Sequence, residues 1–230
     1  MTTWAAGLAA VAALVARWRV VGPGFNWLAG SVVILLGGLG WWAGGGWTAG
    51  VATAAAVAAF AVARRSDAVV AAFVTAALFY AVASVSDGGI LATVSGALAL
   101  GGITGEMLLG HWYLIDPTLP RWALQRLDGA ALVGIVLEMV FLLVAAGRDW
   151  EDAVVGWAFV ALAVTSLLLM VAVWFSLKEP SYPGVMAATG LSYLATLTAM
   201  GAAVAGRALV DEGAGLLAGA ARLAGTLVAS

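Results

Sequence analysis

A stretch of seventeen residues, from Gly105 to Arg121, holds several side chains that could do chemistry. It contains the only histidine of the chain, His111, five residues after a carboxylate, Glu106. An imidazole changes its charge near neutral pH, so it can exchange a proton or form a hydrogen bond. We therefore predict that His111 and Glu106 take part in proton transfer. The alternative for His111 is an interfacial side chain that caps the carbonyl groups at the end of a helix.

A second carboxylate, Glu138, lies near the middle of residues 130–146, which are otherwise apolar. A carboxylate inside a membrane costs at least about 2–3 kcal/mol, and such residues mark functional sites. We predict that Glu138 relays protons, binds a cation or contacts a bound head group; the alternative is a protonated acid bonded to a neighbouring helix. Glu106 and His111 lie about 140° apart on a continuous helix, so they would pair only if the helix ended near Gly110. Glu138 is therefore the expected inner partner of the His111 segment.

Aromatic and charged side chains follow His111 directly. Trp112 and Tyr113 could form the wall of a pocket for a flat ring such as a quinone; the alternative is that they anchor the chain at the membrane interface. Asp116 and Arg121 flank two prolines. Arg121 could bind an anionic head group or pair with Asp116, and the alternative is a rigid turn that Asp116 caps.

A later apolar run carries Thr189 and Tyr193 four residues apart, on one face of a helix. They would line the same pocket as Glu138 if this helix packs beside it; the alternative is that small polar side chains join two membrane helices. The predicted ligand-binding residues are Trp112, Tyr113, Asp116, Arg121, Thr189 and Tyr193, and the predicted proton-handling residues are Glu138, His111 and Glu106.

The composition indicates that these residues sit in a membrane protein. Hydrophobic residues make up 64% of the chain and charged residues 10%, whereas roughly a quarter of the residues of a soluble domain are charged. Apolar runs of about 17–25 residues recur along the chain, and each could cross the hydrocarbon as a helix. Since the runs are long and do not alternate, they favour helices over a barrel. We predict an all-α, polytopic transmembrane helix bundle.

Eight apolar runs predict about eight spans. They cover approximately residues 4–16, 26–43, 47–63, 68–86, 90–110, 128–147, 153–177 and 185–205. In the fifth run, the spacing of Gly101 and Gly105 would let another helix approach closely. We predict a single transmembrane domain, residues 1–206, and a C-terminal apolar tail, residues 207–230, that is an interfacial helix or a weak ninth span. Asp211 and Glu212 make the interfacial helix the preferred form of the tail.

The cations predict the orientation, because Lys and Arg concentrate in cytoplasmic loops. The connections after the first, third, fifth and seventh runs hold Arg17, Arg19, Arg64, Arg65, Arg121, Arg126 and Lys178. The connections on the opposite side hold only Arg148. This bias predicts a multi-pass protein of the plasma (inner) membrane with its N-terminus outside and the His111 segment at the cytoplasmic face.

The residue inventory excludes several kinds of site. The chain has no cysteine, so it cannot bind an iron–sulfur cluster or a cysteine-ligated zinc ion. With a single histidine, it cannot form a bis-His haem site within one chain, and we expect no metal site. A net charge of −2 without a basic run gives no support for nucleic-acid binding.

These features lead to one main hypothesis. We expect an integral membrane subunit of a respiratory-type redox complex that binds a quinone-like lipophilic molecule near the cytoplasmic boundary and handles its protons. Its partners would be the lipid bilayer and subunits that carry redox centres, or further copies of the chain. The expected topology is similar to that of the NrfD-like quinol-interacting subunits of bacterial respiratory reductases, which have eight core helices and no necessary haem.

Two alternatives use the same residues differently. A proton-coupled transporter or ion-conducting protein would use Glu138 as its coupling carboxylate, although the Gly/Pro interruptions expected within transporter helices lie mainly in the predicted loops. A structural or assembly subunit would use its small residues to pack a larger complex. A self-contained enzyme has the least support, because no nucleophile and base pair is evident.

Overall fold

The computed structural model describes residues 1–116, 118–146 and 154–229, with the side chains of residues 66, 86–88, 146 and 211–229 left out. The described residues form helices and contain no strand, which confirms the predicted all-α class. The helices are α1 (Thr2–Trp18), α2 (Pro23–Trp42), α3 (Gly46–Ala61), α4 (Ser66–Ile115), α5 (Arg121–Ala146), α6 (Val154–Lys178) and α7 (Tyr182–Ala229).

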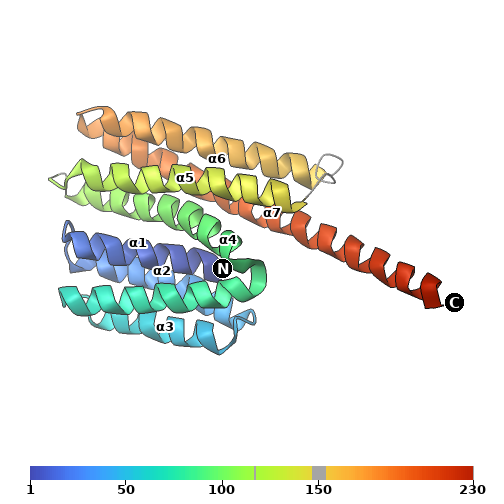
Figure 1. The fold of residues 1–230 in the computed structure, drawn as a ribbon. Coiled ribbons are helices and arrows are strands. Elements are labelled where there is room, and N and C mark those ends of the chain that lie inside the picture. Colours follow the sequence, from blue (N-terminus) through green and yellow to red (C-terminus); the bar gives the residue numbers. More distant parts are fainter. Residues whose placement is uncertain (117, 147–153, 230) are drawn as a thin grey trace.

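Helix α4 consists of two segments that run in opposite directions and are joined by a reversal of the chain at Gly89 (Figure 1). Gly89 has φ 79° and ψ 175°, a backbone conformation that is open almost only to glycine. The first half of α4 (residues 66–88) therefore lies beside α3, and the second half (residues 89–115) returns through the middle of the molecule. The described chain thus contains eight helical segments.

Substituting this glycine should destabilise the fold through the backbone alone. No atom lies within 4 Å of a Cβ built at Gly89, so Gly89→Ala creates no clash. We expect a loss of about 1–3 kcal/mol from the disfavoured φ, measured as a lower unfolding temperature in detergent. Gly22→Ala is the control, because that position is equally open and has no positive φ. Equal stability of the two variants would contradict the strained turn.

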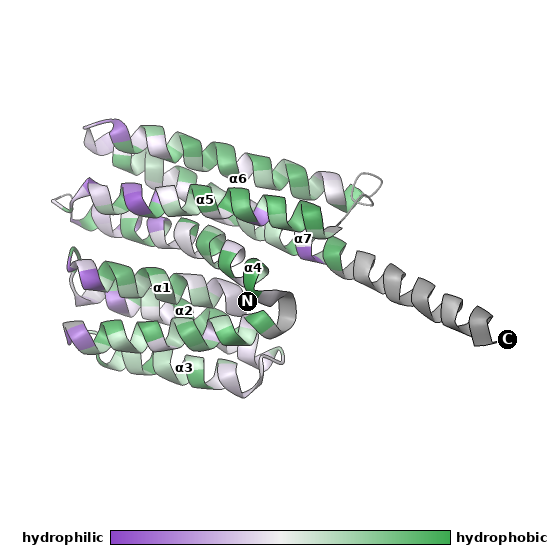
Figure 2. Ribbon diagram, in the orientation of Figure 1, coloured by the Kyte–Doolittle hydropathy of each residue, from purple (hydrophilic) through white to green (hydrophobic). Residues whose placement is uncertain are grey.

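Six segments of the described chain are long and apolar enough to cross a membrane, which agrees with a multi-pass membrane protein. They are Pro23–Trp42, Asp67–Val85, Gly89–Ile115, Arg121–Ala145, Val154–Lys178 and Tyr182–Val210. Helices α1 and α3 are apolar but shorter, with 17 and 16 residues. Apolar residues cover most of the length of the helices in Figure 2, and hydrophilic residues gather near their ends. The span count of eight stays a prediction.

The helices form two groups joined by α4 (Figure 1). One group contains α1, α2, α3 and the first half of α4, and the other contains the second half of α4 with α5, α6 and α7. The second half of α4 contacts α1, α5 and α7, so it is the central helix of the bundle. We call the end of the bundle with the α4–α5 connection the His111 end, and the opposite end the Gly89 end.

Small residues bring the backbones around this central helix into contact. A Cβ added to Gly101 would lie 2.3 Å from the carbonyl carbon of Gly7 in α1, and one added to Gly105 would lie 2.3 Å from Val11 Cγ1. The close approach expected at Gly101 and Gly105 is thus confirmed, and the partner is α1. The absence of side chains at such positions is what allows membrane helices to pack closely.

The C-terminal helix does not break where the sequence suggested a boundary. Helix α7 continues from Tyr182 to Ala229, past the predicted start of the tail at residue 207. Among the residues whose side chains are described, its apolar segment covers Tyr182–Val210. The side chain of Arg207 faces the bundle, where it meets Glu138. Arg207, the first residue of the predicted tail, therefore contacts the bundle, and the form of the tail stays a prediction.

Candidate functional site

Helices α4 and α5 pack as an antiparallel pair with an acidic group near each end of their interface. Close contacts between the helices join Gly134 to Ala99 and Ala131 to Gly102, through their backbones. The same register places Glu138 beside Ser95. At the other end it places Asp128 beside Glu106. The two acidic positions on α5 are ten residues apart in number, which corresponds to roughly 15 Å along the helix.

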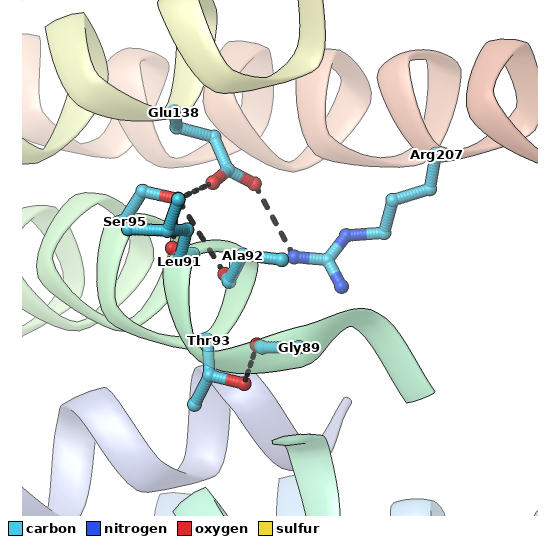
Figure 3. Close-up of polar contacts among 7 residues, drawn as sticks. All are labelled: Gly89, Leu91, Ala92, Thr93, Ser95, Glu138 and Arg207. Carbon is cyan, nitrogen blue, oxygen red and sulfur yellow. Dashed lines mark hydrogen bonds and ion pairs between the residues drawn. The ribbon is translucent and has the colours of Figure 1, made fainter. Parts of the chain in front are cut away.

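Glu138 of α5 forms an ion pair with Arg207 of α7 and a hydrogen bond with Ser95 of α4 (Figure 3). Its Oε1 accepts a hydrogen bond from Arg207 Nη2 of α7 at 3.2 Å, and its Oε2 accepts one from Ser95 Oγ of α4. The Glu138 side chain is 9% exposed and that of Arg207 40%. Gly96 makes room for the guanidinium group, since a Cβ there would lie 2.9 Å from Arg207 Nη2. The buried carboxylate is therefore neutralised within the chain.

This pairing was not foreseen from the sequence. We expected Glu138 to be the inner partner of the His111 segment, but it lies toward the Gly89 end and contacts Arg207 and Ser95. Arg207 had been placed in the tail. A usable signal was present, because an arginine inside one apolar helix and a glutamate inside another each need a partner.

The second acidic group, at the His111 end, consists of Glu106 and Asp128. Both residues are 0% exposed. Ser192 Oγ of α7 lies within hydrogen-bond distance of Glu106 Oε2. Glu106 Oε1 and both carboxyl oxygens of Asp128 have no hydrogen-bond partner. The two carboxylates are close enough for their charges to repel each other.

Sequence reasoning identified Glu106 but missed Asp128 and Ser192. We expected the apolar run to begin at residue 128, whereas α5 begins seven residues earlier, at Arg121. Asp128 is therefore two turns inside the helix. The buried residues Ala123, Leu124, Leu127 and Ala131 repeat at helical spacing, and that spacing puts Asp128 on their face. This periodicity was the signal that could have located it.

His111 lies at the surface of the bundle and contacts Tyr193, another predicted site residue. His111 Nδ1 and Tyr193 Oη are 3.4 Å apart, and both residues are exposed. Helix α4 continues past Gly110 to Ile115, so the condition for a pairing of His111 with Glu106 is not met. The structure thus brings His111 together with Tyr193 and keeps it apart from Glu106 and Glu138.

Thr189 and Trp112 both pack against glycines. Thr189 Oγ1 donates a hydrogen bond to the Val185 carbonyl in its own helix. A Cβ built at Gly110 would lie 2.6 Å from Thr189 Oγ1. The indole of Trp112 covers Gly24, where a Cβ would lie 2.3 Å from Trp112 Cη2. These contacts join α4 to α7 and to α2.

Arg121 and its neighbours form a rigid connection at the His111 end. Arg121 donates hydrogen bonds to the carbonyls of Glu179, Pro180 and Ser181, the last two at 2.7 and 3.0 Å. Tyr113 is buried, with its Oη 3.4 Å from Arg121 Nε. Arg121 therefore ties the start of α5 to the α6–α7 connection.

Asp116 closes the turn between α4 and α5. Its Oδ1 accepts hydrogen bonds from the backbone nitrogen of Thr118 at 3.1 Å and from Thr118 Oγ1 at 2.6 Å. This geometry is that of an Asx turn, the alternative considered for Asp116. Asp116 and Arg121 have no ion pair with each other in the described chain.

An apolar groove of about 540 Å³ lies between the two helix groups. None of the predicted ligand-binding residues lines it. Its walls are Ala6, Gly7, Ala10, Val11, Leu14, Trp18, Ala77, Leu78, Ala81, Thr93, Val94, Ala97, Leu98, Gly102, Arg126, Leu127 and Ala130. Its residues come from α1, both halves of α4, and α5.

Arg126 and two tryptophans mark the His111 end of the groove. The Arg126 guanidinium carbon lies 4.7 Å from the Trp122 ring centroid and 6.0 Å from that of Trp18. The two indoles meet edge to face, with their centroids 5.0 Å apart. The groove is therefore apolar along its length, with a cation and an indole at one end.

No cluster of three or more histidine, cysteine, aspartate or glutamate side chains suited to a metal ion occurs within the described part of the chain. Comparisons with known proteins found no match: no family model, no curated protein and no solved structure is similar to this chain.

Proposed function

We propose that the protein is an integral membrane subunit that binds a quinone-like lipophilic molecule and handles its protons within a redox complex. The observation that supports this proposal best is the groove between the two helix groups. Its volume of about 540 Å³ lies within the usual range for ligand pockets, which are mostly apolar with few polar groups. A ring with an isoprenoid tail matches that chemistry.

The groove is open to the surface that lipid would cover. Leu14, Leu78 and Val94 line it and are exposed by 43%, 62% and 50%. A molecule dissolved in the bilayer could enter sideways without crossing water. Trp18 and Arg126 would then meet its polar head at the His111 end.

The carboxylates supply groups for the proton chemistry. Reduction of a quinone to a quinol consumes two protons as well as two electrons. Glu106 and Asp128 lie near the groove, since Gly102, one helical turn before Glu106, and Leu127, adjacent to Asp128, line it. They are placed to receive or deliver protons from the His111 end, with His111 at the surface.

The electrons must come from a partner. The chain has no cysteine and one histidine, so it cannot hold an iron–sulfur cluster or a bis-His haem of its own. We propose that a redox subunit docks in the membrane or at its surface. The distribution of Lys and Arg supports an orientation in the plasma (inner) membrane with the His111 end at the cytoplasmic face.

The transporter alternative has less support from the geometry. A pathway from Glu138 to the His111 end along α4 and α5 would cross the contacts of Gly134 with Ala99 and of Gly102 with Ala131. There the helix backbones touch, which leaves no room for a row of water molecules in this conformation.

Blocking the groove should remove the bound molecule. Ala10 lines the groove and is exposed, so Ala10→Trp fills space without burying a polar group. We expect quinone in the organic extract of the detergent-purified protein, and a reduction on the order of tenfold in this variant, the equivalent of about 1.4 kcal/mol.

The matched control is Ala58→Trp, the same change at an exposed position of α3 away from the groove. It should retain the wild-type amount of quinone. If wild-type extracts contain no quinone, or both variants retain it equally, the proposed function is wrong. Identification of the proteins that co-purify in mild detergent would test the redox partner separately.

A further inference from the structure

The buried oxygens of Glu106 and Asp128, to which the proposed function assigns proton transfer, form a site whose occupant can be tested without a quinone. We propose that Glu106, Asp128 and Ser192 bind one monovalent cation, either a proton or a sodium ion, at the junction of α4, α5 and α7. The two cations share one chemistry here, because each compensates one of the two negative charges and the remaining charge is shared by the two carboxyl groups. The inference does not depend on a quinone.

Glu106 and Asp128 are buried acids without a compensating charge. Both residues are 0% exposed, and three of their four carboxyl oxygens have no hydrogen-bond partner. Neither has an ion-pair partner within the described chain. An uncompensated buried charge costs several kcal/mol, and two neighbouring ones cost more. Positive charge must therefore reach this site from outside the chain.

The hydroxyl group of Ser192 has two acceptors nearby but only one hydrogen. Its Oγ lies within hydrogen-bond distance of two acceptors, the Ala188 carbonyl at 2.9 Å and Glu106 Oε2. A hydroxyl group has one hydrogen. If this hydrogen bonds the carbonyl, the contact with Glu106 needs a proton on the carboxyl group or a cation that both oxygens share. In that arrangement one positive charge lies in the site. Ser95 has the same two kinds of acceptor, the Leu91 carbonyl at 2.9 Å and Glu138 Oε2, so the serine contact supports the proposal only together with the missing ion-pair partner of Glu106.

The charged groups of the surrounding helices point elsewhere. Arg126 of α5 stacks on Trp122, and Lys178 of α6 lies over the Trp174 ring. His111 of α4 contacts Tyr193 of α7. The contacts that α1 makes near the site come from Trp4 and Val11, which carry no charge.

The charge balance around Glu138 differs from that around Glu106 and Asp128. Glu138 also contacts a serine, Ser95, but Arg207 neutralises it from within the chain. Glu106 and Asp128 have no such arginine. One of the two acidic groups of the α4–α5 interface is thus complete, whereas the other lacks a cation.

The ligand atoms limit what the cation can be. Carboxyl and hydroxyl oxygens suit hard cations, and two carboxylates with one hydroxyl are fewer ligands than calcium takes. The site lies roughly 10–15 Å from the helix ends at the His111 end, judged from the 7 to 10 residues between it and those ends. A single proton or sodium ion fits this position.

Two measurements on the purified full-length protein test the proposal, both after removal of quinone. The first is the unfolding temperature in sodium chloride and in choline chloride at equal ionic strength. The second is the infrared absorption of protonated carboxylic acids. A sodium site predicts a rise of at least about 3 °C in sodium chloride, which is absent from Glu106→Gln and Asp128→Asn. A proton site predicts a carboxylic-acid band without sodium, which is weakened in the same variants.

Glu138→Gln is the matched control, because it removes a buried carboxylate that already has a cation. It should retain the sodium effect or the infrared band of the wild type. The two measurements on the wild type can overturn the proposal even if a variant fails to fold. If the wild type has neither a sodium effect nor a carboxylic-acid band, the site does not bind a cation. That result would leave the groove and its quinone untouched.

Discussion

Gly101→Ala is expected to destabilise the bundle by about 2–3 kcal/mol, as overpacking of a tight interface does. The added Cβ would lie 2.3 Å from the carbonyl carbon of Gly7 and 2.5 Å from its Cα. Both are backbone atoms, so no side chain can rotate away. Helix α1 would have to separate from the second half of α4. The expected result is a lower unfolding temperature in detergent and a larger loss of folded protein on heating.

Gly190→Ala and Gly38→Ala are the controls. No atom lies within 4 Å of a Cβ at either helical position. Alanine is the better helix former by about 0.5–1 kcal/mol, so these variants should be neutral or slightly stabilised. The close α1–α4 contact would be refuted if Gly101→Ala unfolded at the same temperature as the controls.

Arg207→Gln should cost about 2–4 kcal/mol, because it leaves the carboxylate of Glu138 buried without its cation. Removing one partner of a buried ion pair costs about 3–5 kcal/mol, and the lower value here reflects the 40% exposure of Arg207. Glutamine retains a donor for Glu138 but not the charge. The measurement is the unfolding temperature, with Arg207→Lys as a variant that keeps the charge.

The double variant Glu138→Gln/Arg207→Gln shows whether the effect belongs to the pair. With no buried charge left, it should be more stable than Arg207→Gln alone and close to Glu138→Gln. This is the pattern expected for a coupled pair in a double-mutant cycle. Additive losses would mean that Arg207 stabilises the protein through some other contact.

Several features could be predicted from the sequence because they depend on local composition. Long apolar runs between charged connections predict transmembrane helices, because lipid leaves the backbone few other ways to satisfy its hydrogen bonds. The spacing of Gly101 and Gly105 predicted a close helix contact. Individual helix boundaries were less accurate. Arg121 begins α5 seven residues before the apolar run starts, since a helix can begin in a polar segment once its buried face has a partner.

The partners of the buried acids could not be predicted in this way. Glu106 and Ser192 are 86 residues apart in the chain, and Glu138 and Arg207 are 69 apart. Such contacts depend on which helices are neighbours and on their register. For α4 and α5 that register follows from the fit of Gly134 against Ala99.

The sequence by itself determined the class of this protein, its apolar segments and the presence of carboxylates within them. Only the tertiary structure decided which carboxylate is neutralised and which is not. The turn at Gly89 returns the second half of α4 between α1, α5 and α7. Glu138 thereby forms an ion pair with Arg207, whereas the register of α4 and α5 puts Glu106 near a second acid, Asp128. Because the charge balance of a buried group depends on the groups that surround it in space, the cation site we propose between Glu106 and Asp128 could be inferred only from the fold.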